Sequence, residues 1–106
     1  MVMVGNTRLF MAVYSLATME GDVRKRVVVA MKDLSVLGKH EFKNVSTWKR
    51  IVKLKEQTTK YGPAMVNGKM YKDAFENTAR VSMNKTYRKH AEEIFSIWHD
   101  EMTEDL

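Results

Sequence analysis

The sequence predicts an all-α, mainly helical protein: a single compact bundle of about five helices in one domain, residues 1–106. Three observations predict this class. Apolar residues recur at the spacing of a helix along most of the chain, glycines or capping residues separate the periodic segments, and the only proline is Pro63. The length of 106 residues suits one domain, and 44% hydrophobic with 29% charged residues is a globular composition.

The first predicted helix covers residues 7–20, "TRLFMAVYSLATME", and is apolar around most of its circumference. Leu9, Val13 and Leu16 share one helical face. Phe10 and Tyr14 widen that face until little of the helix is polar. Two interpretations are open: a helix at the centre of the bundle, or a helix that a partner covers.

The second predicted helix covers residues 23–37, "VRKRVVVAMKDLSVL", and Asp22 is placed to cap it. Its first turn is basic, with Arg24, Lys25 and Arg26. The run of three valines favours a strand, but the length of the periodic segment favours a helix. Gly38 ends this segment, and residues 39–45 are expected to form a loop.

Residues 46–60, "STWKRIVKLKEQTTK", form the third predicted helix, with Ser46 or Thr47 as its N-terminal cap. Its inner face is predicted to contain Trp48, Ile51, Val52 and Leu54. At 100° per residue, three lysines cluster within about 40° of each other on the outer face: Lys49, Lys53 and Lys60. Arg50 flanks this basic stripe.

The segment after this helix contains a strong turn signal. Asn67-Gly68 lies between the apolar pairs Met65-Val66 and Met70-Tyr71, and an Asn-Gly pair tolerates the positive φ that a two-residue hairpin turn requires. A short β-hairpin near residues 64–71 and a plain loop between helices are both open, because each strand would be very short.

Two more helices are predicted from residue 73 onward. Asp73 is placed to cap the first, with Phe75, Ala79 and either Ser82 or Met83 facing inward. Asn84 is placed to cap the second, whose inner face is predicted to contain Tyr87, Ala91, Ile94, Phe95, Trp98 and Met102. The charges of this last helix oppose its dipole, because basic residues begin it and acidic residues close it.

The charge of the chain is uneven. Residues 1–91 carry 18 basic and seven acidic residues, a net charge of +11, whereas residues 92–106 carry six acidic residues and no Lys or Arg. This asymmetry indicates a body that binds polyanions, with residues 92–106 as the acidic C-terminal end of the last helix and a tail. An ordinary basic protein with a solvated tail explains the same pattern.

Composition excludes several classes of chemistry. The absence of cysteine excludes disulfides and thiolate sites, and favours a cytoplasmic location. The longest apolar run, residues 9–19, is too short to cross a bilayer, so no membrane partner is expected. With no glycine-rich phosphate loop and no identifiable acid–base pair, the chain is expected to be non-enzymatic and to need no cofactor. His90 and His99 lie about 180° apart on a helix, so no metal site is expected.

The order of elements over residues 23–71, a helix, a loop, a basic helix and then the hairpin signal, resembles that of a winged-helix module. Such a module places its basic helix in a nucleic-acid groove. The resemblance is to a general architecture, and the loop is about twice the length of the usual turn. A structural pair of helices in a small bundle explains the same residues. The candidate nucleic-acid-binding residues are Ser46, Thr47, Lys49, Arg50, Lys53, Lys60, Arg24, Lys25 and Arg26.

Two function hypotheses follow. The first is a small regulatory protein that uses the basic helix of residues 46–60 on the phosphate backbone of DNA or RNA. The alternative is a non-catalytic protein-binding module, such as an inhibitor or adaptor that docks on a larger protein, and an exposed cluster near Met65 and Met70 would favour it. A homodimer is expected, because the apolar first helix and the stripe on the last helix could pair with their own copies.

Overall fold

The structure is a computed structural model that describes residues 4–42 and 44–103, and it confirms the mainly helical fold. The elements follow the chain in the order α1 (Val4–Thr18), α2 (Val23–Leu34), a short 3-10 helix η1 (Lys39–Glu41), α3 (Val45–Thr58), β1 (Ala64–Val66), β2 (Lys69–Lys72), α4 (Ala74–Arg80) and α5 (Asn84–Thr103). Within the described residues no helix is both long enough and apolar enough to span a membrane.

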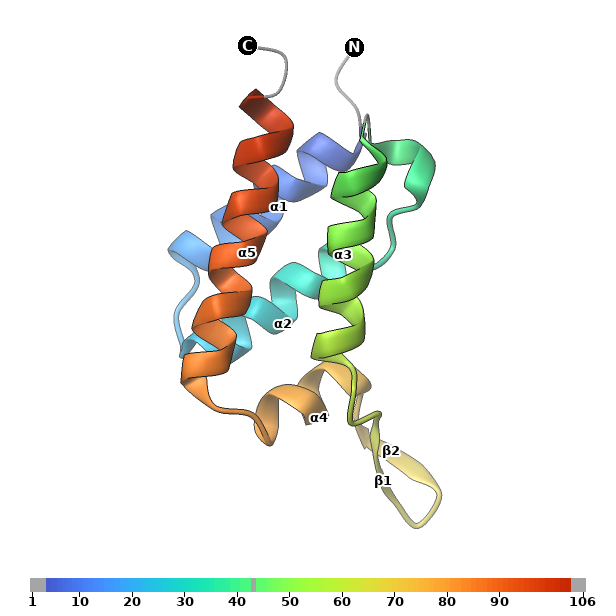
Figure 1. The fold of residues 1–106 in the computed structure, drawn as a ribbon. Helices are drawn as coiled ribbons and strands as arrows, with labels where there is room; N and C mark the ends of the chain where they lie inside the picture. Colours follow the sequence, from blue (N-terminus) through green and yellow to red (C-terminus); the bar gives the residue numbers. More distant parts are fainter. Residues whose placement is uncertain (1–3, 43, 104–106) are drawn as a thin grey trace.

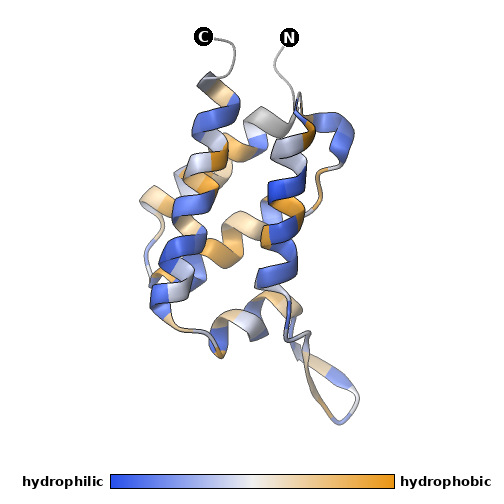
Figure 2. Cartoon of the chain, in the orientation of Figure 1, coloured by the Kyte–Doolittle hydropathy of each residue, from blue (hydrophilic) through white to orange (hydrophobic). Residues whose placement is uncertain are grey.

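The helices form two layers. Helices α3 and α5 lie side by side and run in opposite directions, α1 and α2 cross behind them, and α4 closes the lower end of the bundle (Figure 1). The polar sides of α3 and α5 face away from α1 and α2 (Figure 2). The long dimension of the molecule, 51 Å, includes the hairpin, which projects beyond α4 (Figure 1).

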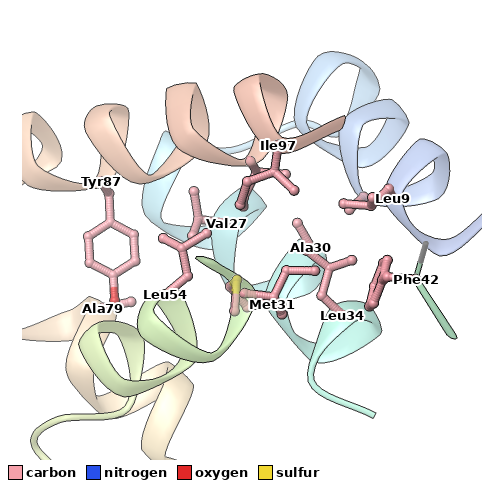
Figure 3. Packing of buried hydrophobic residues seen from close by; sticks show 13 residues of the cluster. Leu9, Val27, Ala30, Met31, Leu34, Phe42, Leu54, Ala79, Tyr87 and Ile97 are labelled. Atoms are coloured by element: carbon pink, nitrogen blue, oxygen red, sulfur yellow. The ribbon is translucent and has the colours of Figure 1, made fainter. Parts of the chain in front are cut away.

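Helix α2 is the centre of the core. Its side chains Val27, Ala30, Met31 and Leu34 have no exposed surface, and all the other α-helices pack against it. The core is completed by Leu9, Ala12, Phe42, Ile51, Leu54, Ala79, Tyr87, Ile94 and Ile97 (Figure 3). The valine run is therefore helical, because burial on several sides outweighs the strand preference of β-branched residues.

Helix α1 is peripheral, so the expectation of a central first helix is wrong. Leu9 and Ala12 are buried, but Phe10, Met11 and Tyr14 are 56%, 45% and 60% exposed. Helix α2 occupies the central position instead, and α1 covers only one side of it. The second interpretation of the apolar circumference, a helix that a partner covers, stays a prediction.

Two of the predicted caps are confirmed. The Asp22 carboxylate accepts hydrogen bonds from the backbone N–H groups of Arg24 and Lys25, at 2.9 and 3.3 Å. The Asp73 carboxylate accepts from the backbone N–H of Glu76 at 2.8 Å, and the Glu76 side chain accepts from the Asp73 N–H in return. These caps satisfy backbone donors that have no partner inside the helix.

The other two caps were predicted at the wrong residues. Helix α3 begins at Val45, with Asn44 at the cap position, so Ser46 and Thr47 already lie inside its first turn. Helix α5 begins at Asn84 itself, and the Tyr87 N–H donates to the backbone carbonyl of Met83. Both predictions chose a polar residue that lies one to three positions after the true cap position. Such a residue also fits the sequence pattern of a helix start, which explains both errors.

The β-hairpin is confirmed. Asn67 and Gly68 both have positive φ, 50° and 78°, as the turn requires. Met65 pairs with Met70 and Val66 with Lys69 in antiparallel register. Residues 65–71 are all exposed, and β2 packs against α4.

The inner faces of α4 and α5 differ in part from the prediction. Phe95, Met102 and Met83 are 51%, 48% and 68% exposed. Tyr87 and Ile94 are buried as predicted, and α5 also buries Ile97 and Glu101, which were not predicted to face inward. The reason is that α5 contacts α1, α2 and α3 together, which turns its buried face toward α3 and leaves one apolar edge outside.

Candidate nucleic-acid interface

The outer side of α3 presents the predicted lysine stripe to solvent. The inner side is fixed by Thr47, Ile51, Leu54 and Thr58, which are buried at helical spacing. Lys49, Lys53 and Ser46 are exposed on the outer side, and Lys60 is exposed in the turn that follows the helix. Within the described residues none of the three lysines forms an ion pair. Their charges are therefore available to a ligand.

Helix α5 adds further basic residues that sequence reasoning did not include. Lys85 and Lys89 are exposed near its N-terminus, and they form no ion pair with a described residue. Because α5 runs antiparallel to α3, its first turns lie beside the C-terminal half of α3 (Figure 1). We call Lys49, Lys53, Lys60, Lys85 and Lys89 the basic face.

A groove of about 250 Å³ lies between the two helices, within this basic face. Lys53 and Gln57 line it from α3, and Lys89 and His90 line it from α5. Burial, followed by the positive charge of Lys60, lowers the pKa of the His90 imidazole. At neutral pH His90 is therefore uncharged, and it can donate or accept a hydrogen bond in a positively charged groove.

Arg50 closes the upper end of this groove and ties α3 to α5. Its guanidinium contacts the carboxylates of Glu93 at 2.5 Å and Asp100 at 2.9 Å, and it donates to the Ser96 hydroxyl at 3.1 Å. The hydrogen bond to Glu93, and then the one to Asp100, raises the pKa of Arg50. The structure thus separates Arg50 from the outward lysines, because two carboxylates already balance its charge.

Thr47 lies in the interior, so the expectation that it faces a ligand is wrong. Its side chain is 5% exposed, and its hydroxyl donates to Oε2 of Glu101 at 2.5 Å. The amide of Asn44 donates to the same oxygen at 3.3 Å. The α3 surface that contains Thr47 packs against α5. The angular positions of residues around α3 alone do not show which neighbouring helix covers that surface.

The basic first turn of α2 belongs to a different surface. Arg24 contacts Asp22 and donates to the backbone carbonyl of Ser82, and Arg26 donates to the carbonyl of Leu16 at 2.8 Å. Lys25 is exposed. A second groove of about 410 Å³, between α2 and α4, is lined by Arg24 and Lys25 rather than by any member of the basic face. Arg24, Lys25 and Arg26 therefore do not lie together with the lysines of α3.

Several acidic side chains near the C-terminus make contacts within the fold. Glu93 and Asp100 contact Arg50, and Glu101 is 2% exposed. Residues 92–103 continue helix α5, while residues 104–106 lie outside the described residues. The described part is therefore not a solvated tail.

The aromatic residues fall into two groups. Trp48 and Trp98 pack against the hydrophobic core, as predicted. Tyr61 and Tyr71 are 56% and 72% exposed near the hairpin. The ammonium groups of Lys60 and Lys72 lie over these two rings, at 5.0 and 5.5 Å from the ring centres.

The remaining titratable residues show no arrangement for metal chemistry. No group of three or more His, Asp or Glu side chains within the described residues could hold a metal ion. His90 faces the groove of the basic face, whereas His99 is exposed and stacks on Phe95, with ring centres 6.3 Å apart.

Comparison of the sequence with models of known families, with curated proteins and with solved structures found no match, so no function is inherited from a relative.

Proposed function

We propose that this protein is a small, non-enzymatic, nucleic-acid-binding regulator that holds the phosphate backbone on its basic face. The observation that carries the proposal is a set of five exposed lysines, without ion pairs to described residues, on α3, on α5 and in the turn after α3; two of them, Lys53 and Lys89, line one groove. Lysine side chains neutralise phosphates and release counterions, which is the main source of sequence-independent affinity.

The spacing of the lysines supports this ligand. Lys49 and Lys53 on α3, like Lys85 and Lys89 on α5, are four residues apart. On a helix this separates them by about 6 Å along the axis, so successive lysines can reach successive regions of an extended polyanion. His90 and Gln57 between the two rows add neutral hydrogen-bonding groups to the groove.

The hairpin supports a second contact. It follows α3 directly and projects from the body, and it carries Lys69, Lys72 and the exposed ring of Tyr71. In this proposal the lysines contact phosphates beside the segment held by the basic face, as the hairpin of a winged-helix module does, and Tyr71 stacks on a base. We place the protein in the cytoplasm, where a chain without cysteine needs no oxidising environment.

Purification at two salt concentrations tests the proposal. Wild type is expected to retain host nucleic acid at low salt, seen as excess absorbance at 260 nm, and to release it at high salt. The variant Lys49→Ala/Lys53→Ala/Lys89→Ala should retain much less. A matched control, Lys25→Ala/Lys39→Ala/Lys55→Ala, removes the same charge from exposed lysines outside the basic face. Equal retention by both triple variants would contradict the proposal.

One observation favours a second candidate, a protein-binding module. The hairpin exposes Met65 and Met70 on one face and Val66 on the other, and Tyr71 is exposed as well; each is more than half exposed. Apolar residues on both faces of a projecting hairpin suit insertion into a partner protein. In this case a protein that co-purifies with wild type should be lost from Met65→Ser/Met70→Ser, while the variant Lys49→Ala/Lys53→Ala/Lys89→Ala should keep it.

A further inference from the structure

We infer that two copies of this chain form a homodimer through an apolar face on α1 and α5, on the other side of α5 from the basic face. This α1–α5 face consists of Phe10, Val13, Tyr14 and Ala17 on α1 and of Ala91 and Phe95 on α5. Its occupant is the same face of a second copy, related by a two-fold axis. The inference stands on residues that the proposed nucleic-acid site does not use.

The α1–α5 face combines a ridge with a groove. The rings of Phe10 and Tyr14 lie 6.3 Å apart on the exposed side of α1 and form the ridge. Beside it, a groove of about 400 Å³ is lined by Val13, Leu16, Ala17, Ala91, Glu92 and Phe95, of which only Glu92 is charged. A soluble monomer rarely leaves such a continuous apolar surface in water.

The arrangement is complementary to itself. In a two-fold interface the same patch occurs on both copies. A ridge on one copy therefore fits only if the patch also contains a groove, which the ridge of the other copy can enter. Here the aromatic ridge of one copy can enter the groove of the other, and the reverse contact forms at the same time. Four helices, α1 and α5 from each copy, would then pack as one bundle.

Charge at the edge of the α1–α5 face indicates a second copy rather than an unrelated partner. Arg88 and Glu92 are exposed, lie one turn apart on the edge that Phe95 also occupies, and form no ion pair with a described residue. When two α5 helices cross antiparallel, Arg88 of each copy can meet Glu92 of the other.

Dimerisation leaves the groove between α3 and α5 open. Lys89 and Phe95 are six residues apart on α5, which turns their side chains about 120° away from each other. Pairing through Phe95 therefore leaves both copies of the groove between α3 and α5 exposed to solvent. A dimer would present two such grooves, each lined by Lys53 and Lys89.

Sedimentation equilibrium over a wide concentration range tests the homodimer. We expect wild type to approach twice the monomer mass of 12.3 kDa and to dissociate on dilution. Phe95→Ser and Tyr14→Ser, at positions already exposed in one copy, should remain helical by circular dichroism and should raise the dimer dissociation constant at least tenfold. Met83→Ser, at an exposed apolar position outside the α1–α5 face, is the matched control and should leave the constant unchanged.

A charge exchange tests the two-fold geometry. Arg88→Glu alone and Glu92→Arg alone should each weaken the dimer about tenfold, because each places like charges opposite one another. The double variant Arg88→Glu/Glu92→Arg should recover most of the affinity. A mass of 12.3 kDa at every concentration would overturn the inference. A dimer that neither Phe95→Ser nor the charge variants weaken would overturn it as well, because the copies would then meet elsewhere.

Discussion

The hydroxyl of Thr47 on α3 donates a hydrogen bond of 2.5 Å to the carboxylate of Glu101 on α5, and both side chains are buried. Arg50, one turn further along α3, contacts Glu93 and Asp100 on the same helix. Polar residues therefore join α3 and α5 at their upper ends, while the lysines of the basic face lie outside this junction. The groove that we propose as the nucleic-acid site depends on this junction for its shape.

Replacing Thr47 should destabilise the fold. Thr47→Val keeps the volume of the side chain but removes a donor to a buried carboxylate, so we expect a loss of about 1–3 kcal/mol in the free energy of unfolding, measured with urea. Thr86→Val, at an exposed position on α5 without a side-chain hydrogen bond to a described residue, serves as control. A Thr47→Val variant as stable as wild type would mean that the junction contributes little.

The two neighbouring aromatic residues Phe95 and Trp98 should respond differently to truncation. Trp98 packs against the core, so Trp98→Ala should cost about 3–5 kcal/mol of unfolding free energy. Phe95 is 51% exposed, so Phe95→Ala should cost much less when measured at a dilution where dimers dissociate. Chemical denaturation of both variants provides the comparison, and similar losses would show that the assignment of inner and outer edges of α5 is wrong.

Asp73 should contribute to the acid sensitivity of the protein. Burial raises the pKa of this carboxyl, but hydrogen bonds from Lys32 and from the Glu76 backbone outweigh burial, and the pKa lies below its usual 3.8. A group with a lowered pKa in the folded state stabilises above its unfolded pKa, and this contribution is lost as the pH falls through the folded pKa. Asp73→Ala should therefore cost about 0.5–2 kcal/mol at neutral pH and much less in strong acid. Urea unfolding at several pH values measures the difference, and an equal cost at every pH would contradict it.

His90 should report the charge of the groove. Burial and then Lys60 lower its pKa, so Lys60→Ala should raise the pKa part of the way toward 6.5, while Lys55→Ala should not change it. A bound polyanion should raise the pKa further, because an opposite charge favours the imidazolium. Titration of the His90 ring by NMR, with and without a DNA duplex, measures both shifts. A pKa that the polyanion leaves unchanged would place the ligand away from this groove.

The sequence predictions were correct where a feature depends on residues close together in the chain. They were wrong where it depends on which helix packs beside it. Asn67-Gly68, Asp22 and Asp73 act through their own neighbours, so turn and capping chemistry were sufficient to predict the hairpin and two helix starts. The lysines of α3 were correctly placed outside because three turns of buried residues fix that face. Thr47 and Phe95 could not be placed, because their environment depends on which helix packs beside them.

Lys85 and Lys89 show the same limit at the candidate site. Their four-residue spacing is visible in the sequence, but only the antiparallel packing of α5 beside α3 relates them to Lys53 and Lys60. Arg24 and Arg26 illustrate the opposite error. They are close to one another in the sequence, yet their side chains hold backbone carbonyls on a surface away from α3.

A salt titration of binding to a DNA duplex and to single-stranded RNA tests the central claim most directly. The logarithm of the binding constant should fall linearly with the logarithm of the salt concentration. Lys49→Ala/Lys53→Ala/Lys89→Ala should bind more weakly to either polyanion and reduce the magnitude of the slope by about 2–3, which corresponds to three lost phosphate contacts. Lys25→Ala/Lys39→Ala/Lys55→Ala should keep nearly the wild-type slope. If all three proteins show the same affinity and slope, or if wild type binds neither polyanion, the basic face is only a solvated surface and the account is contradicted.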